Sequence, residues 1–431
     1  MFQDSPVLDQ AKIKNMKNCQ KLMVKAILYF SLLFTTEYAY AQMDETAFQN
    51  LKVDVVYLAS NLLEGREAGT KGEEMAARYI SNRFQSIGLA PKGKDGAWLH
   101  PFDFQLNTNP HATTGGEQRT GHNVVAYLDN GAATTVVIGA HYDHLGMGVP
   151  GSTLHTGEPA IHNGADDNAS GVAVLLYLAN HLKKSDAPRN NNYLFIAFSA
   201  EELGLIGSKK YIENPTIDLG MVNYMLNMDM VGRLNEEKVL AVNGAGTSPA
   251  WKEALEKINV GGIKVKTSDS GIGPSDHTSF YLADIPVLHF FTGQHSDYHK
   301  PSDDSELINY EGMSDVALFI AGLIKHLDGA GKLVFTKTKD EQQQAASFKV
   351  TLGVMPDYVF DGEGMRIDAV LDDRPAKKAG LEKGDIVIKI GEIEVKTVYD
   401  YMEGLSKFQK GDKAKVKVLR KGEVVEREIT F

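Results

Sequence analysis

The sequence has a single cysteine, Cys19, among its 431 residues. One cysteine excludes a disulfide bond within the chain and any zinc site built from several thiolates. Positive charge is also in deficit, because 45 lysine and arginine residues stand against 56 aspartate and glutamate residues, which gives a formal net charge of -11. Nucleic acids bind basic surfaces, so we expect no nucleic acid partner.

Apolar runs long enough to cross a membrane are absent from the sequence. The apolar segment near the N-terminus, residues 26–36 (AILYFSLLFTT), is shorter than the roughly 20 residues that a spanning helix needs. Lysines precede this run, and the small-residue segment 39–41 (AYA) follows it, which is the order typical of a secretory signal peptide. We therefore expect a signal peptide over residues 1–41 and an exported protein, periplasmic or secreted, without a membrane span once the signal is removed. An uncleaved N-terminal anchor is the alternative.

Short apolar runs alternate with helical patterns over the first three quarters of the chain. The runs that predict strands are 123–128, 134–140, 193–199, 224–229 and 287–291, and those that predict helices include 48–63, 72–89, 172–182 and 313–327. Apolar strands that alternate with helices predict an α/β domain with a mixed, largely parallel central sheet flanked by helices. We expect this domain over residues 42–331.

The pattern changes in the last quarter of the chain. Residues 332–347 are polar and rich in lysine and glutamine, which predicts a linker or, alternatively, an exposed helix end. Short β-rich runs separated by turns follow, with two short helical stretches near 376–379 and 398–405. We expect a small, mostly β domain over residues 348–431.

Acidic residues and histidines recur where the predicted strands end. They stand in the segments HYD (141–143), NGADDNASG (163–171), SAEE (199–202), NMD (227–229) and YH (298–299). In open α/β sheets, ligand sites form outside the carboxyl ends of the strands, and histidine with carboxylates suits zinc and its neighbours. The adjacent Glu201 and Glu202 after a buried strand are unfavourable without a cation. Each segment alone has an ordinary explanation as a turn, cap or surface residue, but their joint occurrence favours a metal site.

At these residues the sequence resembles the M28 metallopeptidase family. The segments HYD, NGADDNASG, AFSAEELGLIGS, NMDMVG and YHKPSDD occur in family order, and GREAGTKGEEMAARYI is similar to the usual lead-in. The resemblance covers roughly residues 51–327 and implies the fold of a zinc exopeptidase with two zinc ions per chain. It implies that His141 and Asp229 bind one ion, that Glu202 and His299 bind the other, and that Asp167 bridges them.

The resemblance also implies the roles of residues around the metals. Asp143 would orient His141, Glu201 would act as the general base, and Tyr298 is a candidate donor to the oxyanion, with simple packing as the alternative. The expected activity is that of an aminopeptidase acting on peptides with a free N-terminus. The alternatives are a single-zinc glutaminyl cyclase and a catalytically inactive peptide-binding protein. Nothing in their spacing marks three nearby histidines as ligands: His144, His155 and His162.

The C-terminal region resembles a PDZ domain. The resemblance is carried by Thr351-Leu352-Gly353-Val354 and by RPAKKAGL with the following GDI. PDZ domains accept an extended peptide as an added strand, so the resemblance implies such a partner beside residues 352–354. A stability module without a ligand is the alternative.

Overall fold

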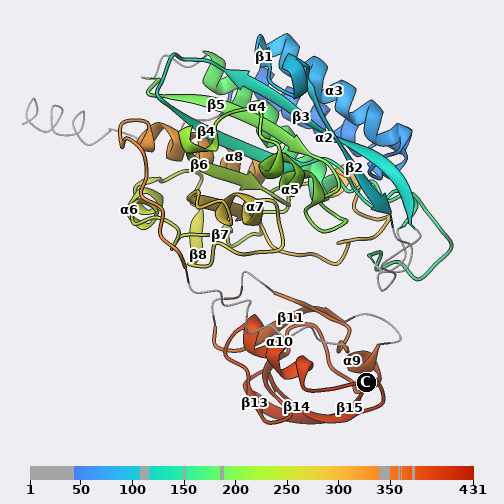
Figure 1. The fold of residues 1–431 in the computed structure, drawn as a ribbon. Coiled ribbons are helices and arrows are strands. Elements are labelled where there is room, and N and C mark those ends of the chain that lie inside the picture. Colours follow the sequence, from blue (N-terminus) through green and yellow to red (C-terminus); the bar gives the residue numbers. More distant parts are fainter. Residues whose placement is uncertain are drawn as a thin grey trace, which may run out of the picture. The chain divides into compact units, whose positions relative to one another are not determined.

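The computed structural model describes residues 43–106, 116–148, 152–184, 189–338, 350–357, 360, 362–370 and 374–431 (Figure 1). The expected signal peptide and residues 339–347 of the expected linker therefore lie outside the described residues. None of the helices in the described ranges combines the length and the apolar character that a membrane crossing requires.

The described strands of the first domain form one mixed sheet in the order β1-β3-β5-β4-β6-β9-β7-β8, with β2 paired to β3. The strands are β1 (Ala90–Pro91), β2 (Leu99–Leu106), β3 (Glu117–Leu128), β4 (Thr134–His141), β5 (Asn191–Phe198), β6 (Val222–Met228), β7 (Val239–Asn243), β8 (Lys264–Ser268) and β9 (Val287–Phe291). The central strands β5, β4, β6 and β9 run parallel, whereas β3 joins β5, and β7 joins β9, in antiparallel pairs. The expected mixed sheet with a parallel centre is confirmed.

Helices cover both faces of this sheet (Figure 1). They are α2 (Glu45–Leu58), α3 (Lys71–Ile87), α4 (Gly171–Lys184), α5 (Ile206–Glu213), α6 (Ala250–Lys257), α7 (His277–Tyr281) and α8 (Tyr310–Leu327), with short turns η1 (Asn61–Arg66), η2 (Lys94–Gly96), η3 (Ala165–Ser170), η4 (Leu219–Met221) and η5 (Ser305–Leu307).

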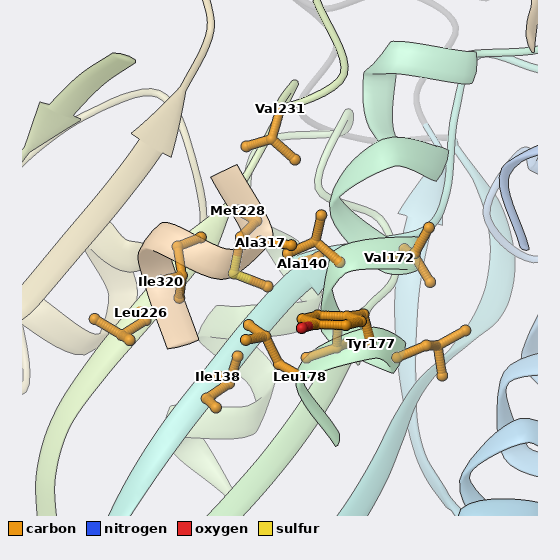
Figure 2. Packing of buried hydrophobic residues seen from close by; sticks show 14 of the residues in the cluster. Ile138, Ala140, Val172, Tyr177, Leu178, Leu226, Met228, Val231, Ala317 and Ile320 are labelled. Carbon is orange, nitrogen blue, oxygen red and sulfur yellow. The ribbon is translucent and has the colours of Figure 1, made fainter. Parts of the chain in front are cut away.

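Side chains of the central strands alternate between two apolar clusters. Ile138 of β4 packs with Leu178 of α4 and Ile320 of α8 in the larger cluster (Figure 2). Val137, one residue earlier, joins Phe280 of α7 in the cluster on the other face. Successive side chains of a strand point to opposite faces, so a strand that is apolar at every position is buried on both. This explains why the centre of the sheet reads as continuous apolar runs.

The helix expected over residues 48–63 is wrong after Leu58. Helix α2 ends at Leu58, and the separate turn η1 follows it. Gly65 in this turn has a φ of +72°, and a Cβ atom there would lie 2.5 Å from the carbonyl oxygen of Gly146. The chain turns here because its backbone packs directly against a neighbouring loop, which helical periodicity does not reveal.

The C-terminal domain is a small antiparallel sheet with two short helices. Its elements are β10 (Val354–Pro356), β11 (Met365–Val370), α9 (Pro375–Lys378), β12 (Ile386–Ile390), β13 (Ile393–Glu394), α10 (Val398–Ser406), β14 (Lys413–Arg420) and β15 (Glu423–Thr430). The strand order is β10-β11-β12-β14-β15, with β13 paired to β12. A separate apolar core that includes Ile367, Val387 and Val416 holds it together, as expected for a mostly β domain.

Candidate metal centre

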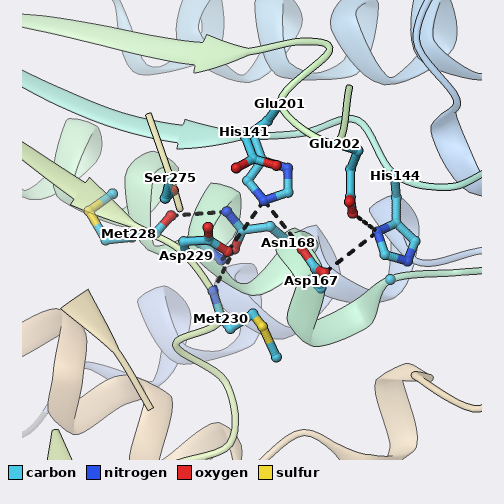
Figure 3. A network of polar contacts seen from close by, with 12 residues as sticks. His141, His144, Asp167, Asn168, Glu201, Glu202, Met228, Asp229, Met230 and Ser275 are labelled. Carbon is cyan, nitrogen blue, oxygen red and sulfur yellow. Dashed lines mark hydrogen bonds and ion pairs between the residues drawn. The ribbon is translucent and has the colours of Figure 1, made fainter. Parts of the chain in front are cut away.

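Three neighbouring parallel strands bring the acidic residues and histidines together at one edge of the sheet. Strand β4 ends at His141, and its register pairs Gly139 with Asn227 of β6. Two residues further on, His141 and Asp229 therefore lie side by side, with 3.3 Å between His141 Nε2 and Asp229 Oδ1. The glutamates 201–202 follow β5, which pairs with β4 on its other side. Figure 3 shows these side chains converging at the strand ends.

Asp167 lies in the turn η3 that leads into α4. Gly164, just before this turn, has a φ of +55°, and a Cβ atom there would lie 2.1 Å from the carbonyl oxygen of Asp167. The buried Asp303 carboxylate accepts hydrogen bonds from the backbone N–H groups of Asp166 and Asp167, at 2.9 and 3.1 Å. Asp303 stands four residues after His299, so the segment that carries His299 also holds the Asp167 turn.

The two oxygens of Asp167 face two different groups of side chains. Its Oδ1 atom lies 3.2 Å from His141 Nε2, beside Asp229. Its Oδ2 atom lies 3.2 Å from His299 Nε2, which is also 3.2 Å from Glu202 Oε2. The structure thus brings together all five residues expected to bind metal.

His144 also lies at this centre, although sequence reasoning set it aside. Its Nδ1 atom is 2.7 Å from Glu202 Oε1 and 3.9 Å from Asp167 Oδ2 (Figure 3). Its ring meets that of His299 edge-on, with centroids 5.8 Å apart. The sequence offered one indication, a second histidine three residues after the one that ends a strand. By contrast, His162 bonds to Thr153 and to the Ala160 carbonyl instead.

The three residues expected around the metals lie at the same place. Asp143 accepts hydrogen bonds from the backbone N–H groups of Glu201 (3.1 Å) and Glu202 (3.4 Å), and its carboxylate is 3.7 Å from His141 Nδ1. The backbone oxygen of Asp143 is nearer to that nitrogen, at 3.2 Å. The Tyr298 ring stacks on that of the adjacent His299, with centroids 3.8 Å apart.

Strained backbone positions cluster around the centre. Ala200, Met230 and His299 have positive φ values of 55°, 56° and 54°. Each is a candidate site residue or adjoins one, and such conformations cost non-glycine residues about 1–3 kcal/mol. They persist where surrounding contacts fix the chain, and they are typical of functional sites.

The buried carboxylates create a strong demand for positive charge. Burial would lower the pKa of His299, but Glu202 and Asp167 raise it to about 11. Burial would raise the pKa of Glu202, but His299 and His144 hold it at about 2. Burial also raises the pKa of Glu201 well above its ordinary range. Without metal, protons on histidine supply the positive charge, and divalent ions would replace those protons.

The donor atoms fit zinc. His141, Asp167 and Asp229 form one group, and His144, Asp167 and Glu202 form another, with the ligand atoms of each group within 4.8 Å of one another. Imidazole nitrogens and carboxylate oxygens are ordinary zinc ligands. His299 Nδ1 also lies 2.8 Å from the carbonyl oxygen of Ser152, a contact that would fix the tautomer with Nε2 toward the carboxylates.

The fold and the site define the class, an α/β protein with a shared histidine–carboxylate centre at the carboxyl ends of its parallel strands. Residues 123–324 match the sequence model of Peptidase family M28, and residues 336–431 match that of the PDZ domain. The chain therefore carries an M28 peptidase domain followed by a PDZ domain.

Several relatives with curated names are aminopeptidases. The chain is 29% identical over 285 residues to "Probable lipoprotein aminopeptidase LpqL" of Mycobacterium tuberculosis, covering 62% of this chain and 51% of that protein. It is 31% identical over 188 residues to "Aminopeptidase YwaD" of Bacillus subtilis, covering 40% of this chain and 39% of that protein. The matches thus span about half or less of these relatives.

Solved structures share the fold at low sequence identity. A zinc aminopeptidase from Bacillus subtilis aligns with a TM-score of 0.51 at 19% identity, over 68% of this chain and 96% of its own. A glutaminyl cyclase from Porphyromonas gingivalis aligns with a TM-score of 0.52 at 16% identity, over 66% of this chain and 99% of its own. The shared fold alone therefore does not distinguish a peptidase from a cyclase.

Proposed function

We propose that the chain is an exported aminopeptidase that holds two zinc ions and removes N-terminal residues from peptides. The observation that carries the proposal is the position of Asp167, whose oxygens face His141 on one side and His299 on the other. One carboxylate shared by two groups of donors would help to hold both cations of a two-metal site. His141 and Asp229 would hold one ion, and Glu202 and His299 the other.

Two bound zinc ions would supply a water molecule of lowered pKa and an electrophile for the scissile carbonyl. Glu201 belongs to neither donor group found in the described ranges. Its carboxylate takes a proton from the attacking water and then delivers it to the leaving amine. Asp143 holds the backbone of Glu201 and faces the Nδ1 side of His141. Tyr298, stacked on His299, is the candidate hydrogen-bond donor to the oxyanion.

The preference for a free N-terminus follows from the groups at the centre. The free α-amine of a substrate would bind near the metal ions and the carboxylates, whereas an acylated or internal amide offers no such amine. The enzyme is therefore an exopeptidase. Its PDZ domain, over residues 348–431 in this proposal, would take an extended peptide as an added strand beside residues 352–354.

Metal content and substrate choice test the proposal together. The protein purified after zinc loading should hold two equivalents of zinc by elemental analysis and should release the chromophore from aminoacyl chromogenic substrates. Matched N-acetylated substrates should not be cleaved, and chelation should abolish turnover. One equivalent of zinc with cyclisation of N-terminal glutamine would favour a glutaminyl cyclase, and no metal would favour an inactive peptide-binding protein. Finding cobalt or manganese in place of zinc would change the identity of the metal and leave the proposed activity unchanged.

Export has its own test. When the whole gene product is expressed with its N-terminus intact, N-terminal sequencing of the extracellular or periplasmic protein should begin at Gln42. Recovery of the protein in the cytoplasm with residues 1–41 retained would contradict export.

A further inference from the structure

The lead-in segment Glu64-Gly65-Arg66 stands outside residues 123–324, which match the peptidase family model. Arg66 is one of the largest fully buried side chains in the described ranges, with a relative exposure of 1%. Burying an arginine is costly unless its donors are satisfied. The partners of this guanidinium therefore bear on what it does.

The Arg66 guanidinium donates four hydrogen bonds to backbone carbonyl oxygens. Its Nε donates to Tyr142 at 2.7 Å, at the strand end between His141 and Asp143. Its Nη1 and Nη2 donate to residues 163 and 164, at 2.6 and 3.0 Å, just before the turn that carries Asp167. A further bond from Nη1 reaches the carbonyl of Leu58 at the end of α2.

Backbone hydrogen bonds also join the lead-in turn to the segment after β4, and here the segment donates and the turn accepts. The N–H of His144 donates to the carbonyl oxygen of Arg66 at 3.3 Å, and the N–H of Gly146 donates to that of Gly65 at 3.1 Å. The absence of a Cβ atom at Gly65 permits this approach. The lead-in turn is therefore joined both to the strand end after β4 and to the turn before α4.

The charge of Arg66 also suits this position. Burial lowers its pKa to about 10, with Asp143 and Asp167 acting against that lowering, so the guanidinium remains charged at neutral pH. A fixed cation behind the ligand segments partly offsets the repulsion among the carboxylates in front of them. A lysine would keep the charge, but its single ammonium cannot reproduce the planar fork that reaches separate carbonyl groups.

We infer that Arg66 is a positioning residue of the metal centre: its guanidinium holds the segment of His141 and the turn of Asp167 in the register that lets both bind metal. The inference rests on the proposed zinc centre. It extends the functional unit to a segment upstream of the matched peptidase region.

The test compares Arg66→Lys with a matched control, Arg83→Lys. Arg83, whose side chain is 25% exposed, makes a bidentate ion pair with Asp54, so its replacement should lower stability without touching the ligand segments. We expect Arg66→Lys to weaken zinc binding about 10- to 100-fold in a chelator competition assay, as for other residues that orient ligands. The visible absorption spectrum of the cobalt-substituted protein should change as well. Arg83→Lys should keep wild-type zinc affinity and cobalt spectrum.

The outcomes separate this inference from the proposed function. Wild-type protein that binds no zinc would refute the proposed function itself. Wild-type protein with two zinc ions, together with an Arg66→Lys variant of unchanged zinc affinity and cobalt spectrum, would refute only the positioning role.

A measurement on the wild-type chain covers the case in which Arg66→Lys does not fold. Zinc loading should slow hydrogen exchange at the amides of His144 and Gly146, which donate to the lead-in turn, together with amides of residues 166–167. Slower exchange at 166–167 alone would show that metal binding does not stabilise the hydrogen bonds between the lead-in turn and the segment after β4. That result would overturn the inference.

Discussion

Replacing Glu201 by glutamine should separate catalysis from metal binding. Glu201 is 9% exposed, and its backbone N–H donates to Asp143, a contact that the side-chain change leaves intact. The amide keeps the shape of the side chain but cannot accept a proton. Because Glu201 belongs to neither donor group in the described ranges, both zinc ions should remain bound.

The expected size of the effect follows from the role of the carboxylate. Positioned general bases contribute about 10²- to 10⁴-fold to the rate. The activation free energy of hydrolysis should therefore be about 3–5 kcal/mol higher in Glu201→Gln than in the wild type. The assay is kcat on an aminoacyl chromogenic substrate, with zinc measured in the same samples. Burial raises the pKa of Glu201 on folding, so its charged form opposes folding at neutral pH. The metal-free variant should therefore unfold at a higher temperature than metal-free wild type.

The neighbouring residue supplies the control. Glu202→Gln makes the same chemical change one residue further along, but it alters a side chain 3.2 Å from His299 Nε2 and within a donor group. This variant should lose zinc as well as activity. Turnover of Glu201→Gln within threefold of wild type would show that another group is the base. Full zinc content in Glu202→Gln would show that the ligand assignment is wrong.

Three further predictions concern stability. Glu73 accepts hydrogen bonds from Ser199 (2.6 Å) and Tyr142 (3.0 Å), and Glu73→Gln should cost about 2–3 kcal/mol by urea unfolding at pH 7. Burial raises the pKa of Glu73, but hydrogen bonds from His122 and Ser199 leave it below its ordinary value. The stability difference between wild type and Glu73→Gln should therefore shrink as pH falls below about 4, where the carboxylate is protonated. A stability difference that grows over this range would contradict the reasoning. When free zinc is at 100 times its Kd, the two sites together should stabilise the protein by about 5 kcal/mol. Removing zinc with a chelator should therefore lower Tm by on the order of 10 °C. An unchanged Tm would count against a metal-stabilised fold. In the separate PDZ core, Ile367→Ala should destabilise that domain by about 2–5 kcal/mol, seen as an earlier urea transition, and an equal loss of aminopeptidase activity at that transition would contradict independent cores.

The centre of the sheet was predictable because a strand that is buried on both faces is apolar at nearly every position. The segments 134–140 and 193–199 are continuous apolar runs, and they correspond to β4 and β5 with end points that differ by at most two residues. The edge strand β2 was not predicted, although its residues alternate between buried and exposed. A histidine and a proline near its start hide that alternation in the sequence. The short strands β7 and β8, of five residues each, also went unpredicted.

The site was predictable where family motifs contain it and unpredictable where only tertiary contacts create it. The five expected ligands converge because parallel strands bring their carboxyl ends to one edge. His144 joins them because the backbone after β4 continues past Glu202, where the imidazole meets the carboxylate at 2.7 Å. No spacing rule in the sequence expresses that distance.

The residues around the ligands explain why the resemblance extends beyond the ligands themselves. Asp143 binds the backbone N–H groups after β5, Asp303 binds those of the Asp167 turn, and Arg66 binds the carbonyl oxygen that follows His141 and those just before the Asp167 turn. Each therefore fixes backbone rather than metal. A centre with several buried carboxylates and three positive-φ residues cannot rely on its ligands alone to hold the chain, because without metal its carboxylates repel one another and only protons on the histidines offset that repulsion. In the proposed centre, the motif residues that would bind no metal thus supply the order that the expected ligands require.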